Sequence, residues 1–150
     1  VFVIIADHCA SAAGKQTLPV TGYHIPFLIF SPAHIQPQKI NRMVSQIDVT
    51  PTILGILNMT YISKFFGQDI LRMPQGTDRA FISTYSNLGY VRDSNLIVQS
   101  PPQKLRQWRP DFKTGTAMEV SLNDSLNRQA ISYYQLASKL FKTNGYKEIK

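Results

Sequence analysis

Continuous apolar runs, rather than alternating ones, mark the first part of the chain. Residues 1–6 form a Val/Ile-rich run, which is typical of a strand buried on both faces in a parallel α/β sheet. A second run, residues 25–32, includes Pro26 and Pro32 near its two ends, and these prolines limit the length of a strand. The two runs predict two central strands of an α/β fold.

Two helices are predicted from the spacing of apolar residues and from residues typical of helix ends. Thr50 is placed as an N-cap with Pro51 at the first helical position, and Ile53, Leu54, Ile56 and Leu57 supply the apolar face. Apolar residues recur at helical spacing over 122–141, and Asn144-Gly145 follows as a stop signal. The second helix is expected on the surface, packed on a sheet.

The region between these helices favours antiparallel strands. Residues 80–85 are strand-like, and residues 90–100 predict a hairpin with Asp93-Ser94-Asn95 in the turn. Residues 99–110, with three prolines, are interpreted as a connection. No internal repeat is visible, so we expect one continuous unit over residues 1–150.

Composition indicates a globular protein, with 43% hydrophobic and 17% charged residues and no apolar stretch of the roughly 18 to 20 residues that a membrane span needs. A single cysteine excludes an internal disulfide. The net charge is +7, and residues 104–150 hold nine Lys and Arg against four Asp and Glu. These cations are scattered, so we expect solvated surface rather than a nucleic-acid-binding stripe, with attraction to anionic lipid as an alternative.

Asp7 and His8 directly follow the first apolar run. In parallel α/β sheets, ligands bind beyond the carboxyl ends of the strands. A carboxylate and an imidazole both suit Zn or Mn. The pair could share one ion only if the chain turns as it leaves the strand, which the small residues 9–14 allow. The alternative is a capping carboxylate beside a surface histidine.

The chain opens without Met and already inside an expected central strand. A buried parallel strand needs neighbours on both sides. We therefore expect the sequence to be the second half of a larger domain, although 150 residues would also suit one domain.

Four segments in order carry a family resemblance: Asp7-His8 at a strand end, Tyr23–Ile29 before Ser31-Pro32, Gln46–Leu54, and Phe65–Leu71. Together they resemble the C-terminal part of the sulfatase family in the alkaline phosphatase superfamily, and most closely the lipoteichoic-acid-synthase-like phosphoglycerol transferases. The resemblance implies parallel central strands plus a small antiparallel sheet and a C-terminal helix. It divides the chain into a metal-site part, 1–71, and the C-terminal strands and helix, 72–150.

The resemblance implies roles for particular residues. Asp7 and His8 match the pair that binds a divalent metal (Mn, Zn or Ca, with Mn or Zn favoured), although Cys9 stands where the family usually has Gly. His24 and Lys15 match positions that contact the anionic oxygens of the substrate. The alternatives are a structural histidine and a solvent-exposed lysine. Asp48 is interpreted as structural, near the start of a helix.

The implied function is transfer of a phosphoryl or sulfuryl group. A phosphoglycerol transferase would pass glycerol phosphate from a lipid to an acceptor through a threonine nucleophile, whereas a sulfatase would hydrolyse a sulfate ester with a modified cysteine. Neither nucleophile context is present here, so we expect the nucleophile in the remainder of the catalytic domain, upstream, and an inactive isolated fragment. The substrate would be an anionic ester, including lipid-linked ones. The parent protein would be membrane-anchored in the cell envelope, with an extracytoplasmic catalytic domain.

A hypothesis of another class is a non-catalytic module whose basic tail binds an anionic polymer or a membrane surface. It predicts that charge reversal at Lys139 and Lys142 abolishes function while Asp7→Ala and His8→Ala leave it unchanged. The enzyme hypothesis predicts the opposite.

Overall fold

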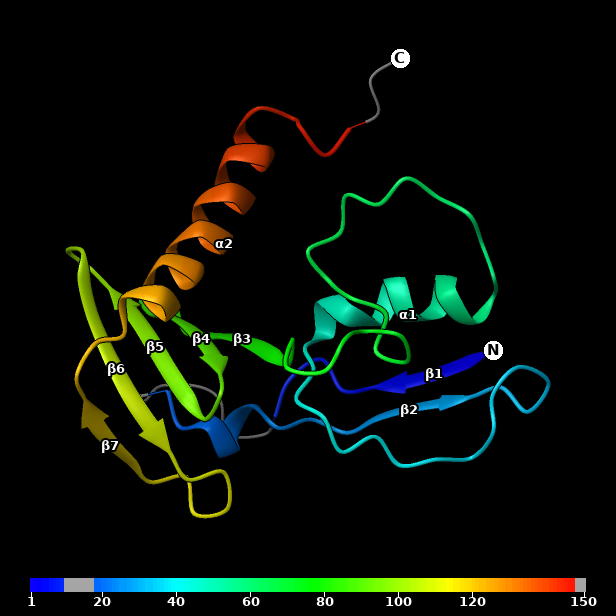
Figure 1. Ribbon diagram of the computed structural model, residues 1–150, viewed down its shortest axis with the longest axis horizontal. Helices are drawn as coiled ribbons and strands as arrows, with labels where there is room; N and C mark the ends of the chain where they lie inside the picture. The colour runs from blue at the N-terminus through cyan, green and yellow to red at the C-terminus, as the bar shows by residue number, and fades with distance from the viewer. Residues whose placement is uncertain (10–17, 148–150) are drawn as a thin grey trace.

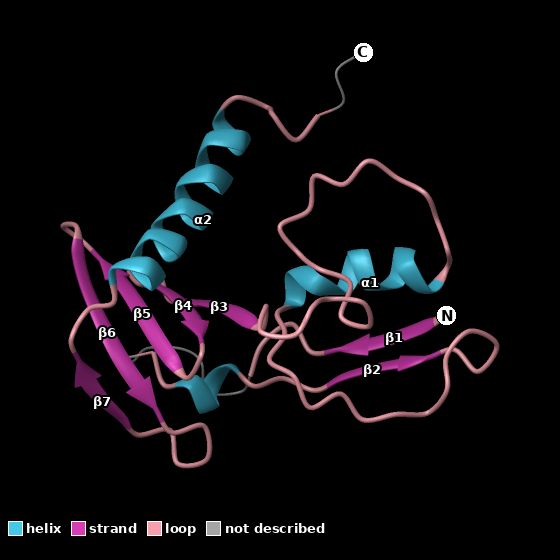
Figure 2. Ribbon diagram, viewed as in Figure 1, coloured by secondary structure: helices cyan, strands magenta, loops and turns pink. Residues whose placement is uncertain are grey.

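The computed structural model describes residues 1–9 and 18–147 of the chain. Two parts lie side by side in Figure 1: a two-stranded sheet with helix α1, and a five-stranded antiparallel sheet with helix α2. Figure 2 shows the same division by secondary structure, with long loops concentrated around the smaller sheet. The protein is therefore an α/β molecule with the predicted small antiparallel sheet and C-terminal helix.

The smaller sheet differs from the predicted parallel arrangement. β1 (Phe2–Ile5) pairs antiparallel with β2 (Phe27–Phe30), with Phe2 opposite Phe30 and Ile4 opposite Leu28. These four side chains share one face and are all more than half exposed. The expectation of a first strand buried on both faces is wrong for the described residues, because no other described strand or helix covers this face.

Helix α1 (Val49–Ile56) begins earlier than predicted. It follows the 3-10 turn η2 (Gln46–Asp48), and Asp48 rather than Thr50 is its N-cap residue. Pro51 is the third helical residue, not the first. This position is tolerated because the first four N–H groups of a helix lack an intrahelical partner, so the missing proline N–H removes no bond.

The larger sheet is a meander in which every strand pairs with the next one along the chain. Its strands are β3 (Arg79–Ser83), β4 (Leu88–Arg92), β5 (Asn95–Ser100), β6 (Lys104–Pro110) and β7 (Ala117–Val120). The predicted hairpin is confirmed: Asp93 and Ser94 both have positive φ, at 49° and 58°, as a two-residue hairpin turn requires. The interpretation of residues 99–110 as a connection is wrong, because seven of them form β6.

Helix α2 (Asp124–Lys142) packs on the larger sheet as expected (Figure 1). The side chain of its N-cap residue, Asn123, accepts a hydrogen bond from the Leu126 N–H at 3.0 Å. Ala130 is fully buried against Tyr90 and Ile97 on one face of the sheet. No helix in the described part of the chain is long and apolar enough to cross a membrane.

The other face of the larger sheet carries a second apolar cluster, formed by Leu18, Val20, Ile82, Val91 and Leu96. Val20 belongs to the 3-10 turn η1 (Val20–Tyr23), which immediately precedes the β2 segment. The segment that leads into β2 is therefore anchored on the larger sheet, and this contact fixes the position of the smaller sheet.

A buried ion pair provides a second connection between the two parts. Arg79 at the start of β3 donates two hydrogen bonds to the Asp48 carboxylate, at 3.0 and 2.9 Å, and the two side chains are 1% and 0% exposed. Asp48 also accepts from the Ser45 and Gln68 backbone N–H groups, both at 2.8 Å. Three segments of the chain, the η2 turn with Ser45, the loop at Gln68 and the start of β3, thus meet at one carboxylate.

Candidate functional site

Asp7 and His8 lie one residue beyond the end of β1, in the turn that carries the chain away from the smaller sheet. The His8 backbone N–H donates to Asp7 Oδ1 at 2.9 Å, and His8 Nε2 lies 3.6 Å from Asp7 Oδ2. The side chains are 87% exposed for Asp7 and 72% exposed for His8. The turn therefore brings the carboxylate and the imidazole to the same side, which was the condition for sharing one ion.

The donor atoms of this pair fit a metal ion. Bonds of about 2.0–2.2 Å place two donors of a tetrahedral site about 3.3–3.6 Å apart, and the observed Nε2 to Oδ2 separation is 3.6 Å. His8 Nδ1 lies 3.0 Å from the Cys9 carbonyl oxygen, which can only accept. This contact selects the tautomer with the proton on Nδ1 and leaves the Nε2 lone pair for a metal, as is usual in metal-binding histidines.

The described residues supply no third donor. Within residues 1–9 and 18–147, no group of three His, Cys, Asp or Glu side chains could hold a metal ion. Two protein ligands are too few for a closed site. Asp7 and His8 are therefore part of a possible ligand set, and their metal-binding role stays a prediction.

Gln46 holds the backbone of this turn and was not identified from the sequence. Its side-chain amide donates to the Ala6 and Asp7 carbonyl oxygens at 3.0 and 2.9 Å. Gln46 opens η2, so the turn that leads into α1 also fixes the end of β1. The only sequence signal was its place in the Gln46–Leu54 segment.

The structure brings His24 to the same region. The Cys9 thiol donates to the His24 carbonyl oxygen at 2.8 Å, joining two residues 15 positions apart. His24 is exposed, and it lines a large open groove of about 1,040 Å³ together with Ile5 and Gln46. An imidazole on this groove is accessible to a ligand, while its contact with a substrate remains a prediction. Lys15, the other predicted substrate-binding residue, lies outside the described residues.

Asp48 has the structural role that the sequence predicted. Its carboxylate is fully occupied by Arg79 and two backbone N–H groups. Burial by itself lowers the pKa of the Arg79 guanidinium, but hydrogen bonding and attraction to Asp48 outweigh it, so the pKa lies above the ordinary arginine value. The Arg79 guanidinium therefore stays charged in the folded protein.

Gly67 explains why the Phe65–Leu71 segment can pack closely against the Gln46–Leu54 segment. A Cβ at this position would collide with the Ile47 carbonyl oxygen. The 66–68 loop can therefore approach η2 closely, and there the Gln68 N–H and the Phe66 carbonyl reach the Asp48–Arg79 pair. The two segments together hold η2 in place, and Gln46 of η2 contacts the backbone just after β1.

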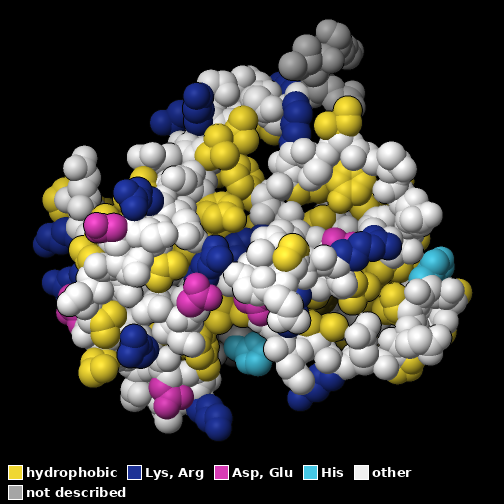
Figure 3. All heavy atoms as spheres, in the orientation of Figure 1, with side chains coloured by type: hydrophobic (Ala, Val, Ile, Leu, Met, Phe, Trp, Pro, Cys, Tyr) yellow, Lys and Arg dark blue, Asp and Glu magenta, His cyan; other side chains and the backbone are white. Residues whose placement is uncertain are grey.

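Surface character adds little to this picture. Figure 3 shows hydrophobic side chains along α2 and on the side of the smaller sheet, with Lys and Arg side chains spread over the visible face. The cations do not form one continuous stripe there.

Two comparisons with known proteins agree with the resemblance found in the sequence. The family model described as Sulfatase matches residues 1–59. A crystal structure of a protein in the alkaline phosphatase superfamily from Vibrio parahaemolyticus is similar to this chain, with a TM-score of 0.91 and 32% sequence identity. The similarity covers 99% of this chain and 36% of that protein, so the chain spans about a third of the length of its relative.

Proposed function

Because this chain belongs to the sulfatase family of the alkaline phosphatase superfamily, whose enzymes act on phosphoryl and sulfuryl esters, we propose that it is part of a metal-dependent phosphoglycerol transferase. In this proposal Asp7 and His8 are two of the metal ligands. The observation that supports the metal site is the contact of His8 Nδ1 with the Cys9 carbonyl oxygen. This contact directs Nε2 toward the side of the Asp7 carboxylate.

The carboxylate and imidazole donors suit Mn or Zn. Such a cation would stabilise negative charge on the ester oxygens and lower the pKa of the attacking hydroxyl. The chain's own residues have simpler tasks. Asp7 and His8 hold their donor atoms on one side of the turn, and Gln46 keeps that turn in place. His24, and Lys15 with it, would donate hydrogen bonds to the anionic oxygens of the substrate.

The preference for a transferase rests on the Gln46–Leu57 and Phe65–Leu71 segments, which resemble the phosphoglycerol transferases. The nucleophile would be a threonine outside this chain. The substrate would be a lipid-linked glycerol phosphate, and the parent protein would be anchored in the membrane with its catalytic domain on the outer side. A sulfatase that hydrolyses sulfate esters is the alternative within the family.

The test compares Asp7→Asn and His8→Gln in the intact protein with the matched variants Asp124→Asn and His34→Gln, which lie outside the site. Bound metal is measured by mass spectrometry, and turnover is measured as release of diacylglycerol from a fluorescent phosphatidylglycerol. We expect the first pair to lose bound metal and at least about 100-fold in turnover. The control pair should retain both.

Retention of metal and turnover in Asp7→Asn and His8→Gln would contradict the metal site. Hydrolysis of nitrophenyl sulfate without transfer from the lipid would favour the sulfatase alternative. Loss of function on charge reversal of Lys139 and Lys142, with the Asp7 and His8 variants unaffected, would instead support the binding module.

A further inference from the structure

A second recess lies on the larger sheet, on the face opposite helix α2. It has a volume of about 330 Å³ and is lined by Leu18, Pro19, Asn87, Leu96, Val98, Ser100, Lys104, Arg106, Trp108, Gly115 and Ala117. It shares no residue with the Asp7–His8 turn or with His24. We call it the sheet groove.

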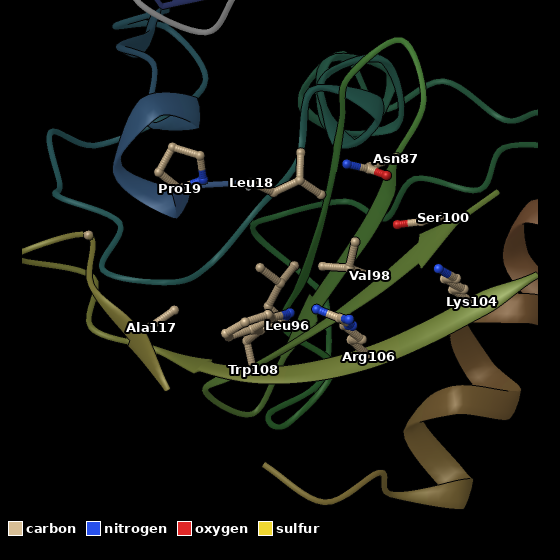
Figure 4. Close-up of a pocket in the computed structure, with 11 residues that line it drawn as sticks. Leu18, Pro19, Asn87, Leu96, Val98, Ser100, Lys104, Arg106, Trp108 and Ala117 are labelled. Atoms are coloured by element: carbon tan, nitrogen blue, oxygen red, sulfur yellow. The ribbon is translucent and has the colours of Figure 1, made fainter. Parts of the chain in front are cut away.

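The floor of the sheet groove is built by cross-strand pairs of β5 and β6. Leu96 is opposite Trp108, Val98 opposite Arg106, and Ser100 opposite Lys104. Directly opposed residues of an antiparallel pair share one face. Figure 4 shows the resulting two rows, with Trp108, Arg106 and Lys104 following one another along β6 beside Leu96, Val98 and Ser100 of β5.

The side chains that line the groove change from apolar at one end to positively charged at the other. At one end Leu96 is buried and the indole of Trp108 is half-buried, with Leu18 and Pro19 on the adjacent side (Figure 4). At the other end stand the exposed cations Arg106 and Lys104. None of the described residues that line the groove is a carboxylate, although Glu119 pairs with Trp108 on the same face of the sheet.

Glu119 of β7 is the nearest acidic partner of this cationic end. Its Oε1 lies 3.8 Å from Arg106 Nε, and the two side chains are 51% and 60% exposed. An exposed pair at this distance is weak. The guanidinium therefore keeps N–H donors for a bound anion.

An aromatic plane beside aliphatic groups suits the apolar face of a sugar ring. Further along β6, the Arg106 guanidinium and the Lys104 ammonium suit a phosphate or sulfate ester. The Ser100 hydroxyl, opposite Lys104, can donate to an oxygen of the same ester. The volume is at the lower end for a small-ligand pocket. We propose that the sheet groove binds a saccharide that carries a phosphate or sulfate ester.

The proposal is tested by measuring, with calorimetry, the binding of glucose 6-phosphate and of glucose 6-sulfate to the intact protein. Trp108 is the single tryptophan of this sequence, so a change in indole fluorescence on titration that is absent in Trp108→Phe provides a second readout. At least one of the two esters should bind at least about tenfold more tightly than glucose or inorganic phosphate, and binding should weaken as salt rises. Binding should persist in His8→Gln, which separates this site from the proposed metal site.

Variants on one strand provide matched controls. Arg106→Gln and Lys104→Gln should each weaken ester binding about tenfold, the usual effect of losing one charge-assisted hydrogen bond. Arg109→Gln removes an exposed cation from the opposite face of β6 and should change nothing. Trp108→Ala should weaken binding about fivefold, and Trp108→Phe should recover part of the loss. Thermal melting checks that each variant is folded.

The groove proposal fails if neither ester binds more tightly than inorganic phosphate and glucose. It also fails if Arg109→Gln weakens binding as much as Arg106→Gln does. Unchanged affinity in folded Trp108→Ala would show an anion contact without sugar recognition, which contradicts the proposal as well.

Discussion

Gln46 connects the candidate site to the rest of the molecule through one side-chain amide. The amide donates to two consecutive carbonyl groups, those of Ala6 and Asp7, just before the His8 imidazole. It touches neither donor atom of the proposed metal pair. Gln46 is therefore a positioning residue, and its loss should loosen the turn without removing a ligand.

We expect Gln46→Ala to weaken metal binding by the proposed site about 10- to 100-fold, the usual cost of losing a supporting hydrogen bond. The measurement is a metal titration of the intact protein, with turnover followed at saturating metal. Turnover should recover at high metal concentration, which would not occur for Asp7→Asn. Gln38→Ala, at another exposed glutamine, is the control, and equal metal affinity in both variants would exclude the positioning role.

Tyr134 shows how a single hydroxyl ties α2 to the sheet. Its OH donates to the Gly89 carbonyl oxygen at 2.9 Å, and burial raises the pKa of the phenol to about 12. The free tyrosine value is 10.0. A raised folded pKa means that the stabilisation is complete below about pH 10 and is lost as the pH rises through about 12.

We therefore expect Tyr134→Phe to lower the free energy of unfolding at neutral pH by about 1 kcal/mol, the usual net worth of a hydrogen bond. The difference between wild type and variant should shrink as the pH is raised from about 10 to 12. Urea unfolding at a series of pH values measures this. A constant difference across that range would show that the phenol of Tyr134 has the same pKa in the folded and the unfolded protein.

The buried Asp48–Arg79 pair is the main polar link between elements. It joins η2 to β3 across 31 positions of sequence, and the Phe66 carbonyl accepts a further bond from Arg79 at 2.9 Å. Removal of one partner from such a pair leaves an uncompensated buried charge. The position of η2, and with it the side chain of Gln46, therefore depends on this pair.

Arg79→Met should lower the free energy of unfolding by about 3–5 kcal/mol. Arg72→Met is the matched control, because Arg72 pairs with Asp69 at 2.9 Å but is 64% exposed. The control should cost less than about 1 kcal/mol. Urea unfolding followed by circular dichroism measures both, and a similar cost for the two variants would contradict the role given to the buried pair.

The elements that could be predicted from the sequence are those with strong local signals. Helix α2 has a long apolar stripe with an Asn-Gly stop, and the β4–β5 hairpin has turn residues that adopt positive φ. β6 lacked such a signal, because its residues are mostly polar and prolines stand at both of its ends. Its strand conformation comes from pairing with β5 and β7, which is a tertiary effect.

The candidate site was predictable only in part, for a similar reason. Asp7 and His8 follow a recognisable apolar run, and Asp48 has a clear place before a helix. Gln46 and Arg79 gave no separate signal, because their partners are distant in sequence and include backbone carbonyl groups. The antiparallel pairing of β1 with β2 was also not predictable, since a continuous apolar run does not encode strand direction.

At the scale of the whole molecule, the two parts are held by contacts of different range. Strands β3 to β7 each pair with their neighbour along the chain. The smaller sheet joins β1 to a strand about 25 residues away, and its position depends on η1 and on the Asp48–Arg79 pair. Local pairings close short loops and form faster than distant ones.

The meander therefore has a consequence for the order of events during folding. Strands β4 and β5 and helix α2 should acquire their hydrogen bonds first, and the pairing of β1 with β2 should come later. Pulse-labelling hydrogen exchange during refolding measures this, and simultaneous protection of both sheets would contradict it. In this sequence of events, Asp7 and His8 reach the neighbourhood of His24 only after the scaffold that carries the sheet groove is complete.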